Sequence, residues 1–180
     1  MSVVEDHSQP TNTIESRKKR LDEYLSKLQA CESEIPQHIL DAVRGELDKG
    51  YIKAPDMLEI KDIKQILKRL SFTNYYNYAP AIRLALKGLP PFRMSLPVEQ
   101  RFRVLFEAIQ GPFELVKKQR RTTQCVISYD YILHKFAKLL DLEDHAQNFP
   151  LAADPDKVRC QDHIWTEICE VLGWPYQPSL

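Results

Sequence analysis

Apolar residues recur in this chain at intervals of three and four positions, which is the spacing of one face of an α-helix. The first such run follows Asn12 and Glu15, a pair with the form of a capping box, and it ends near Glu32. The side chains expected to face inward from this run are Leu21, Tyr24, Leu25 and Leu28. The pattern therefore predicts a helix directly after a polar N-terminal stretch.

Proline and glycine separate the next apolar runs, as they do at helix ends. A second predicted helix has Pro36 in its first turn and Gly50 as a left-handed C-terminal cap. A third opens with Asp56 and Glu59, and a fourth is stopped by Gly88. Three helices of ordinary length are thus expected between these residues.

The region that follows contains two more breaks. A proline-rich loop leads to a fifth helix, which starts at Ser95 and is interrupted at Gly111 and Pro112. A second, angled segment is expected after the interruption, and residues Lys117 to Gln124 are predicted to form a basic loop.

The last third of the chain is rich in large aromatic residues at helical spacing. Ser128 is a good N-cap for a helix that runs to about Leu140, and a final helix begins near Pro155 and ends at Gly173. The aromatic residues continue into the closing Trp174 to Leu180 segment. We therefore expect the C-terminal residues to belong to the folded body.

Composition supports an all-α fold, because the chain has only five glycines and a weak strand signal. We predict a single compact multi-helix domain of about seven or eight helices over residues 13–180, preceded by a short flexible leader over residues 1–12. The apolar stretches are far shorter than the roughly 20 residues that cross a bilayer. A membrane partner is therefore not expected.

Lysine and arginine together balance aspartate and glutamate, so the formal net charge is zero. Any contact with nucleic acid must then come from a local patch. Two groups of basic residues are candidates for such contacts: Arg17, Lys18, Lys19 and Arg20 at the start of the first helix, and Arg101, Arg103, Lys117, Lys118, Arg120 and Arg121 further on. The first group fits a solvated helix start equally well, and the second is the better candidate for a phosphate-facing patch.

Tyrosines and a tryptophan near helix ends could contact a partner or brace one helix against the next. The candidates for partner contact are Tyr75, Tyr76, Tyr129, Tyr131 and Trp174. Both interpretations stay open at this stage, and bracing is the more common role of such residues.

Catalytic and metal-binding patterns are weak in this sequence. No nucleophile and base occur in a recognised motif, and His134 beside Lys135 fits a packed or exposed histidine better than a catalytic one. The four cysteines form no C-x-x-C pair and are expected to be reduced thiols, and Cys160 with His163 would supply only two zinc ligands. We therefore expect no enzyme activity, no metal, no cofactor and no small-molecule substrate.

Several short motifs keep a fixed order from about Arg17 to Leu180. They are Leu25-x-x-Leu28-Gln29-Ala30-x-Glu32, Asn74-Tyr75-Tyr76, Gly88-x-Pro90-Pro91, Ser128-Tyr129-x-Tyr131-x-Leu133-x-Lys135-Phe136, Phe149-Pro150-Leu151, Asp162-x-Ile164-Trp165-x-x-Ile168-Cys169 and Trp174-x-x-x-Pro178-Ser179. In this order and spacing the chain resembles the poxvirus late transcription factor 3-like family of large nucleocytoplasmic DNA viruses.

The resemblance implies a non-catalytic factor that acts with a virus-encoded RNA polymerase or with other late transcription factors, with DNA as a further candidate partner. It places the protein inside the infected cell, in cytoplasmic viral factories, with the host nucleus and the virion as alternatives. Members of the family commonly carry a zinc ribbon with paired cysteines ahead of the matched region. Sixteen residues without a cysteine precede Arg17 here, and Lys19-Arg20-Leu21 stands where the family usually has Asn-His-Phe. We expect the ribbon to be absent from this chain or supplied by another one.

A second class of function remains open beside transcription. The zero net charge also fits an assembly or scaffold protein that binds other viral proteins and no nucleic acid. The proteins that co-purify with the chain would separate the two possibilities.

Overall fold

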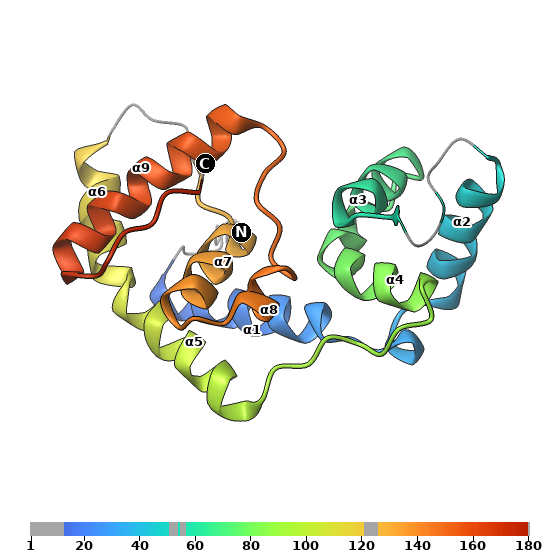
Figure 1. Ribbon diagram of the computed structural model, residues 1–180, viewed down its shortest axis with the longest axis horizontal. Helices are drawn as coiled ribbons and strands as arrows, with labels where there is room; N and C mark the ends of the chain where they lie inside the picture. Colours follow the sequence, from blue (N-terminus) through green and yellow to red (C-terminus); the bar gives the residue numbers. More distant parts are fainter. Residues whose placement is uncertain (1–12, 51–53, 55–56, 121–125, 180) are drawn as a thin grey trace, which may run out of the picture.

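The structure, a computed structural model, describes residues 13–50, 54, 57–120 and 126–179. Within these ranges every regular element is a helix, which confirms the predicted all-α fold (Figure 1). The α-helices are α1 (Ile14–Leu28), α2 (Gln37–Asp48), α3 (Ile60–Arg69), α4 (Ala79–Leu86), α5 (Leu96–Ala108), α6 (Gln110–Gln119), α7 (Tyr129–Leu139), α8 (Glu143–Ala146) and α9 (Pro155–Leu172). Two 3₁₀ turns accompany them, η1 (Glu32–Glu34) and η3 (Thr73–Tyr78).

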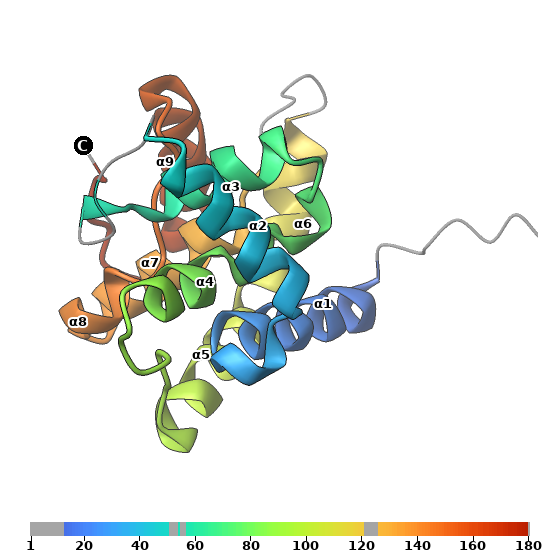
Figure 2. The ribbon, with the colours of Figure 1, turned by 90° about the vertical axis from the view of Figure 1, so that its right-hand side faces the viewer.

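The buried apolar side chains form two separate cores. The first core collects residues of α1 and of α5 to α9, and the second collects residues of α2, α3 and α4 with the segments around them. Figure 1 shows the second group at the right, and Figure 2 shows it face-on. The helices of the second core are therefore inserted in the sequence between two parts of the first.

Helix α1 joins the two cores. Its Leu21, Tyr24, Leu25 and Leu28 side chains belong to the first core, yet the helix also packs against η3 and α4. At the same junction Asp130 of α7 accepts a hydrogen bond from the Tyr24 hydroxyl and forms a 3.1 Å ion pair with Lys64 of α3. The inserted helices are thus fixed to the first core by packing and by a polar contact.

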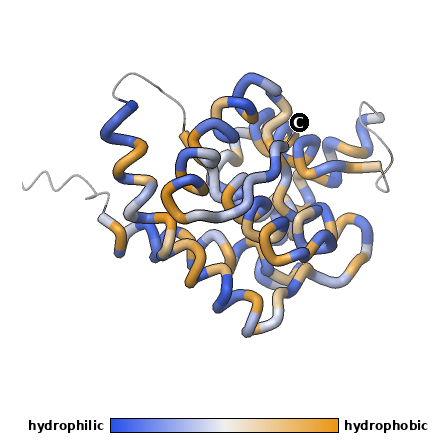
Figure 3. The backbone as a smooth tube through the Cα atoms, turned by 60° about the vertical axis from the view of Figure 1, so that its left-hand side comes forward, coloured by the Kyte–Doolittle hydropathy of each residue, from blue (hydrophilic) through white to orange (hydrophobic). Residues whose placement is uncertain are grey.

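Each helix carries apolar residues on one face and polar residues on the other, so the colours alternate along the tube in Figure 3. The predicted helix caps are correct at Ser128, which accepts a hydrogen bond from the Tyr131 amide at 3.3 Å, and at Gly173, whose φ is 66°. The left-handed conformation at Gly173 suits a residue without Cβ.

Two predicted helix starts are displaced. Helix α1 is capped by Thr13, whose hydroxyl oxygen accepts a hydrogen bond from the Ser16 amide at 3.2 Å. Helix α3 begins with a capping box of Glu59 and Asp62, so its N-cap lies three residues beyond the predicted one. The predicted cap residues Asn12 and Asp56 lie outside the described residues.

The predicted break after the fifth helix is confirmed, since α5 and α6 meet at Ile109 and Pro112 lies in the first turn of α6. The predicted basic loop is wrong for Lys117 to Gln119, which form the last turn of α6. Buried Val116 continues the apolar face of α6 to this point, and this packing stabilises the extra turn. Residues 121–124 of the predicted loop lie outside the described part of the chain.

The closing segment packs on the first core, as predicted. Trp174 contacts Trp165 of α9 with ring centroids 6.2 Å apart, and the Ser179 amide donates a 2.9 Å hydrogen bond to Asp162. Cys31 and Cys169 are free thiols, but Cys160 is disulfide-bonded, so the prediction of reduced cysteines is wrong at Cys160. Among the described helices, none is long and apolar enough to span a membrane.

Candidate functional site

Many of the predicted basic residues form ion pairs within the molecule. Four of these pairs join residues far apart in the sequence, and they tie α1 to α5 and α6, and α6 to α9. The pairs are Arg17 with Glu114 at 2.6 Å, Lys18 with Glu107 at 3.0 Å, Arg103 with Asp22 at 2.9 Å and Arg120 with Glu167. The carboxylates cancel much of the positive potential that these residues would otherwise present.

The other predicted basic residues are exposed and lie on three helices. Lys19, Arg101, Lys117 and Lys118 have no ion pair among the described residues. Arg20 donates hydrogen bonds to the backbone and side-chain oxygens of Ser16. Arg121 lies outside the described residues.

The predicted partner-binding aromatics are mostly packed against the cores. Tyr131 is fully buried, and its hydroxyl donates a 2.5 Å hydrogen bond to Asp162, so the prediction of an exposed contact residue is wrong for Tyr131. Tyr75 and Tyr76 are half-buried against the second core, and Trp174 is half-buried against the first. Their exposed edges remain candidates for partner contact.

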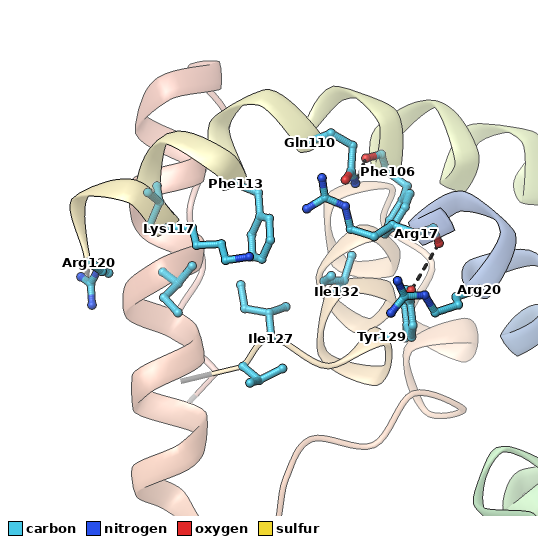
Figure 4. A pocket seen from close by; sticks show the side chains of 13 residues that line it. Arg17, Arg20, Phe106, Gln110, Phe113, Lys117, Arg120, Ile127, Tyr129 and Ile132 are labelled. Atoms are coloured by element: carbon cyan, nitrogen blue, oxygen red, sulfur yellow. Dashed lines mark hydrogen bonds between the residues drawn. The ribbon is translucent and has the colours of Figure 1, made fainter. Parts of the chain in front are cut away.

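Among the predicted aromatics, Tyr129 lines a cavity. The cavity has a volume of about 460 Å³ and lies between α1, α6, α7 and α9 (Figure 4). Its walls are mainly apolar and include Phe106, Phe113, Val116, Ile127, Tyr129 and Ile132. Its basic residues are Arg17, Arg20, Lys117 and Arg120. The cavity therefore joins an apolar interior to a group of positive charges.

Two residues that line the cavity each have a buried polar atom without a hydrogen-bond partner among the described residues. Gln110 is 4% exposed, and its Nε2 donates a 2.8 Å hydrogen bond to the Phe106 carbonyl, but its Oε1 accepts none from the described residues. Arg17 is 9% exposed, and its Nε is likewise without an acceptor, although its Nη1 is paired with Glu114. Both residues line the cavity (Figure 4), but the two atoms themselves are buried behind its surface.

The aromatic rings of the cavity are braced by neighbours. The Arg17 guanidinium lies over the Phe113 ring, 5.6 Å from its centroid, and Tyr129 packs against Tyr24 and Phe106. The Tyr129 hydroxyl donates a 3.3 Å hydrogen bond to the Arg17 carbonyl. Burial raises the pKa of Tyr129, and the Arg20 and Arg17 charges oppose the rise without cancelling it.

The sequence pointed to Arg17, Lys117 and Arg120 as candidates but did not show that they line the same cavity. Gln110 and Phe113 were not predicted as site residues. The available signal was the mixture of Phe113 and Val116 with lysines on one short helix. That mixture is typical of an apolar surface bordered by positive charge.

A second polar cluster was also missed. Asp162 of α9 accepts hydrogen bonds from Tyr131 and Ser179 and forms a 3.2 Å ion pair with Lys135, which also donates a 2.6 Å bond to the Gln177 carbonyl. Burial would raise the pKa of Asp162, but the bonds from Ser179 and Tyr131 and the Lys135 charge outweigh burial, so the pKa is lowered. The cluster fastens the closing segment to α7 and α9, which is a structural role.

Among the described residues no group of three or more histidine, cysteine or acidic side chains is arranged to hold a metal ion. The fold is that of an all-α protein with an apolar-walled cavity bordered by basic residues. The chain belongs to the family described as Poxvirus Late Transcription Factor VLTF3 like, whose sequence model matches residues 9–176.

Relatives of the chain are found in giant viruses. The chain is 36% identical over 165 residues to an inferred transcription factor of Acanthamoeba polyphaga mimivirus, and 35% identical over 161 residues to one of Paramecium bursaria Chlorella virus 1. A second mimivirus relative, also an inferred transcription factor, is 24% identical over 152 residues. The matches cover 91%, 89% and 84% of this chain but only 38%, 44% and 58% of the relatives. No solved structure matches the chain significantly.

Proposed function

We propose that this chain is the helical part of a viral late transcription factor and acts by binding proteins of the virus-encoded transcription machinery. Membership of the family and the names of the giant-virus relatives support the role in late transcription. The main support for binding to proteins is that several residues predicted to bind phosphate form ion pairs within the molecule instead. What these pairs leave for a partner is the basic, apolar-walled cavity.

The charge argument favours protein over DNA as the main partner. Affinity for duplex DNA grows with the number of phosphates that a protein neutralises, and each contact adds close to one unit to the salt dependence. Here four predicted cations are already matched by carboxylates, and the chain as a whole has no net charge. A phosphate approaching this surface meets little net positive potential.

The remaining candidates for contact with DNA are the exposed cations Arg101, Lys117 and Lys118. Lys19 is a further candidate. A mobility-shift titration with duplex DNA across salt tests this part. We expect weak binding with a salt slope no larger than about 4 in magnitude, because four cations at most make these contacts. A slope near 6 that the double substitution Lys117→Glu and Lys118→Glu lowers by about 2 would show that DNA is the main partner.

Depletion and add-back in extracts of infected cells test the role in transcription. Removing the protein should lower transcription from late viral promoters and leave early promoters active, and adding it back should restore the late transcripts. Affinity capture from the same cells should recover subunits of the viral polymerase. Unchanged late transcription, with capsid or membrane proteins captured instead, would favour the scaffold function.

A further inference from the structure

We propose that one face of α7 and α9 is a peptide-binding site, and that the closing segment, residues 174–179, fills this site until a partner displaces it. This α7–α9 face consists of Tyr131, Lys135, Asp162 and Trp165. The ligand is an extended segment of a partner protein that carries a tryptophan, a tyrosine and a serine or threonine at the spacing of the closing segment. None of the four residues lines the cavity between α1 and α6, so the face is a second, separate site.

Helical spacing brings the four side chains of this face together. Tyr131 and Lys135 are four residues apart on α7, and Asp162 and Trp165 are three residues apart on α9. All four are more than nine-tenths buried. The Lys135 ammonium lies 3.2 Å from the Asp162 carboxylate, which also accepts a 2.5 Å hydrogen bond from the Tyr131 hydroxyl. The face therefore holds one carboxylate and one ammonium beside two aromatic rings.

The polar contacts of the closing segment show which groups of a peptide this face binds. Asp162 accepts hydrogen bonds from the Ser179 amide at 2.9 Å and from the Ser179 hydroxyl at 2.6 Å. Lys135 donates a 2.6 Å hydrogen bond to the Gln177 carbonyl, two residues earlier. Alanine at the serine position would leave the buried carboxylate with one donor fewer, and an acidic residue there would place two like charges together. The face therefore selects a hydroxyl residue at this position.

The rings of the closing segment define the rest of the pattern. The Lys135 ammonium lies 5.6 Å from the centroid of the Tyr176 ring, a cation–π contact. The Trp174 and Trp165 rings are 6.2 Å apart between centroids. The ligand pattern is therefore tryptophan, then tyrosine two residues later, then serine or threonine three residues after the tyrosine.

The closing segment is held by side chains, not by a backbone ladder. Among the described residues, the backbone of residues 175–179 forms no hydrogen bond with another backbone group. The segment leaves α9 at Gly173, whose φ is 66°, and turns back along the helix (Figure 1). Glycine tolerates many backbone conformations, so the segment can swing away at this point while α9 stays in place.

The segment also leaves room for a competitor. Its residues 175–178 are exposed. A hollow of about 180 Å³ lies between the segment and α7, with Pro175 and Gln177 on one side and Lys138 and Leu139 on the other. A partner segment can therefore reach the face without unfolding a helix.

A different protein is a better source of the ligand than a second copy of this chain. In a second copy the segment lies beside its own α7–α9 face, at an effective concentration in the millimolar range. Exchange between two copies replaces each contact by an identical one and costs the freedom of two separate molecules. The segment of another protein competes only with the closing segment, which lowers its apparent affinity by the fraction of sites that are filled.

Fluorescence anisotropy with synthetic peptides tests the proposal. The probe is a labelled, C-terminally amidated peptide with the sequence of residues 173–180. The proteins are the full chain and its variant Ser179→Pro, which lacks both donors that Asp162 accepts. We expect the variant to bind the probe with a Kd below about 100 µM and about tenfold more tightly than the wild type, because its own segment competes less.

Altered probes test the contact with Asp162. Alanine in place of the serine should raise the Kd about tenfold, because a hydrogen bond to a charged group is lost. Glutamate in place of the serine should abolish measurable binding. Alanine in place of the glutamine is the control and should change the Kd less than about threefold, since the hydrogen bond at Gln177 uses only its carbonyl.

Fluorine NMR follows the closing segment in the wild-type chain. The chain has two tryptophans, so 5-fluorotryptophan gives two signals, which Trp174→Phe assigns. Unlabelled probe peptide at about 5 mM should move the Trp174 signal toward that of an exposed indole. A peptide of scrambled sequence should leave both signals in place.

Substitutions in the chain locate the site. Added to Ser179→Pro, Asp162→Asn should raise the Kd of the probe about tenfold, and Glu170→Gln, exposed on the same helix, should change it less than about twofold. Circular dichroism shows whether each variant folds. Where Asp162→Asn does not fold, the alanine probe still reports the same hydrogen bonds.

The proposal fails if Ser179→Pro does not bind the probe, or binds it no more tightly than the wild type. It also fails if the alanine or glutamate probe binds as tightly as the serine probe, or if the Trp174 signal stays in place. Light scattering that finds a dimer in the wild type and a monomer in Ser179→Pro would make a second copy the occupant. Because the peptides are synthetic, these outcomes are separate from the depletion experiment.

Discussion

The buried carboxylate of Asp162 supports a sharp prediction about stability. Its oxygens accept hydrogen bonds from the Tyr131 hydroxyl at 2.5 Å, the Ser179 hydroxyl at 2.6 Å and the Ser179 amide at 2.9 Å, and they lie 3.2 Å from the Lys135 ammonium. The Lys135 side chain is only 4% exposed. Replacing Asp162 therefore leaves a buried positive charge and several donors without their acceptor.

The expected magnitude follows from these contacts. Removing one partner of a buried ion pair costs about 3–5 kcal/mol, because the other charge is left uncompensated. Asp162→Asn keeps the shape and one acceptor oxygen, so we expect it to lower the free energy of unfolding by about 2–4 kcal/mol. Burial lowers the pKa of Lys135, and Asp162 opposes this only in part, so Lys135→Met should cost less than Asp162→Asn.

Equilibrium unfolding in urea at pH 7 measures these changes. The double variant Asp162→Asn with Lys135→Met should regain about 1 kcal/mol or more relative to Asp162→Asn alone, because the uncompensated ammonium is gone. Glu170→Gln, at an exposed position of the same helix, is the control and should change stability by less than about 0.5 kcal/mol. A loss at Asp162→Asn as small as in the control would refute the assigned role of the cluster.

The pH dependence gives an independent check on Asp162. Its pKa is lower in the folded protein than in the unfolded chain. The stabilisation is therefore fully present above the ordinary carboxyl pKa near 3.9 and is lost as the pH falls through the lower folded value. Acid unfolding should show a loss of stability below about pH 4 in the wild type that is smaller in Asp162→Asn.

Three further changes test other features of the fold by urea or thermal unfolding. Ser128→Ala removes the N-cap bond of α7 and should cost about 1 kcal/mol, whereas a negligible change would show that the cap is dispensable. Gly173→Ala places a Cβ at a positive φ and should cost about 1–2 kcal/mol. Burial lowers the pKa of His134, so the stability of the protein should fall as the pH drops from about 6.5 through the pKa of the folded state. His134→Gln should remove this loss. A pH profile that is the same in the variant and the wild type would contradict the assignment to His134.

Helix positions could be predicted from the sequence because periodicity is a local signal. The apolar face of α1, with Leu21, Leu25 and Leu28, is the face that is buried. Helix starts were less certain, since neighbouring residues such as Asn12 and Thr13 can serve as the same cap. The division into two cores could not be predicted, because amphipathic patterns show that each helix buries one face but not which helices meet.

The candidate site was predictable only in part for the same reason. The charges of Arg17 and Arg120 are visible in the sequence, but their partners Glu114 and Glu167 are distant along the chain, and Arg17 and Glu114 are 97 residues apart. Tyr129 and Tyr131 look equivalent in the sequence, yet positions two apart face different sides of a helix. Consequently Tyr129 reaches the cavity and Tyr131 is buried beside Trp165.

The insertion of α2, α3 and α4 between α1 and α5 has a consequence for synthesis on the ribosome. The inserted helices meet one another over short sequence distances, so their core can close while the rest of the chain is still being made. Helix α1 precedes the inserted helices in the chain and packs against η3 and α4, but its buried side chains belong to the core that it shares with α5 to α9. Its apolar face, including Leu21 and Leu25, cannot be fully covered until α5 to α9 have been made, and during this interval these side chains are open to aggregation.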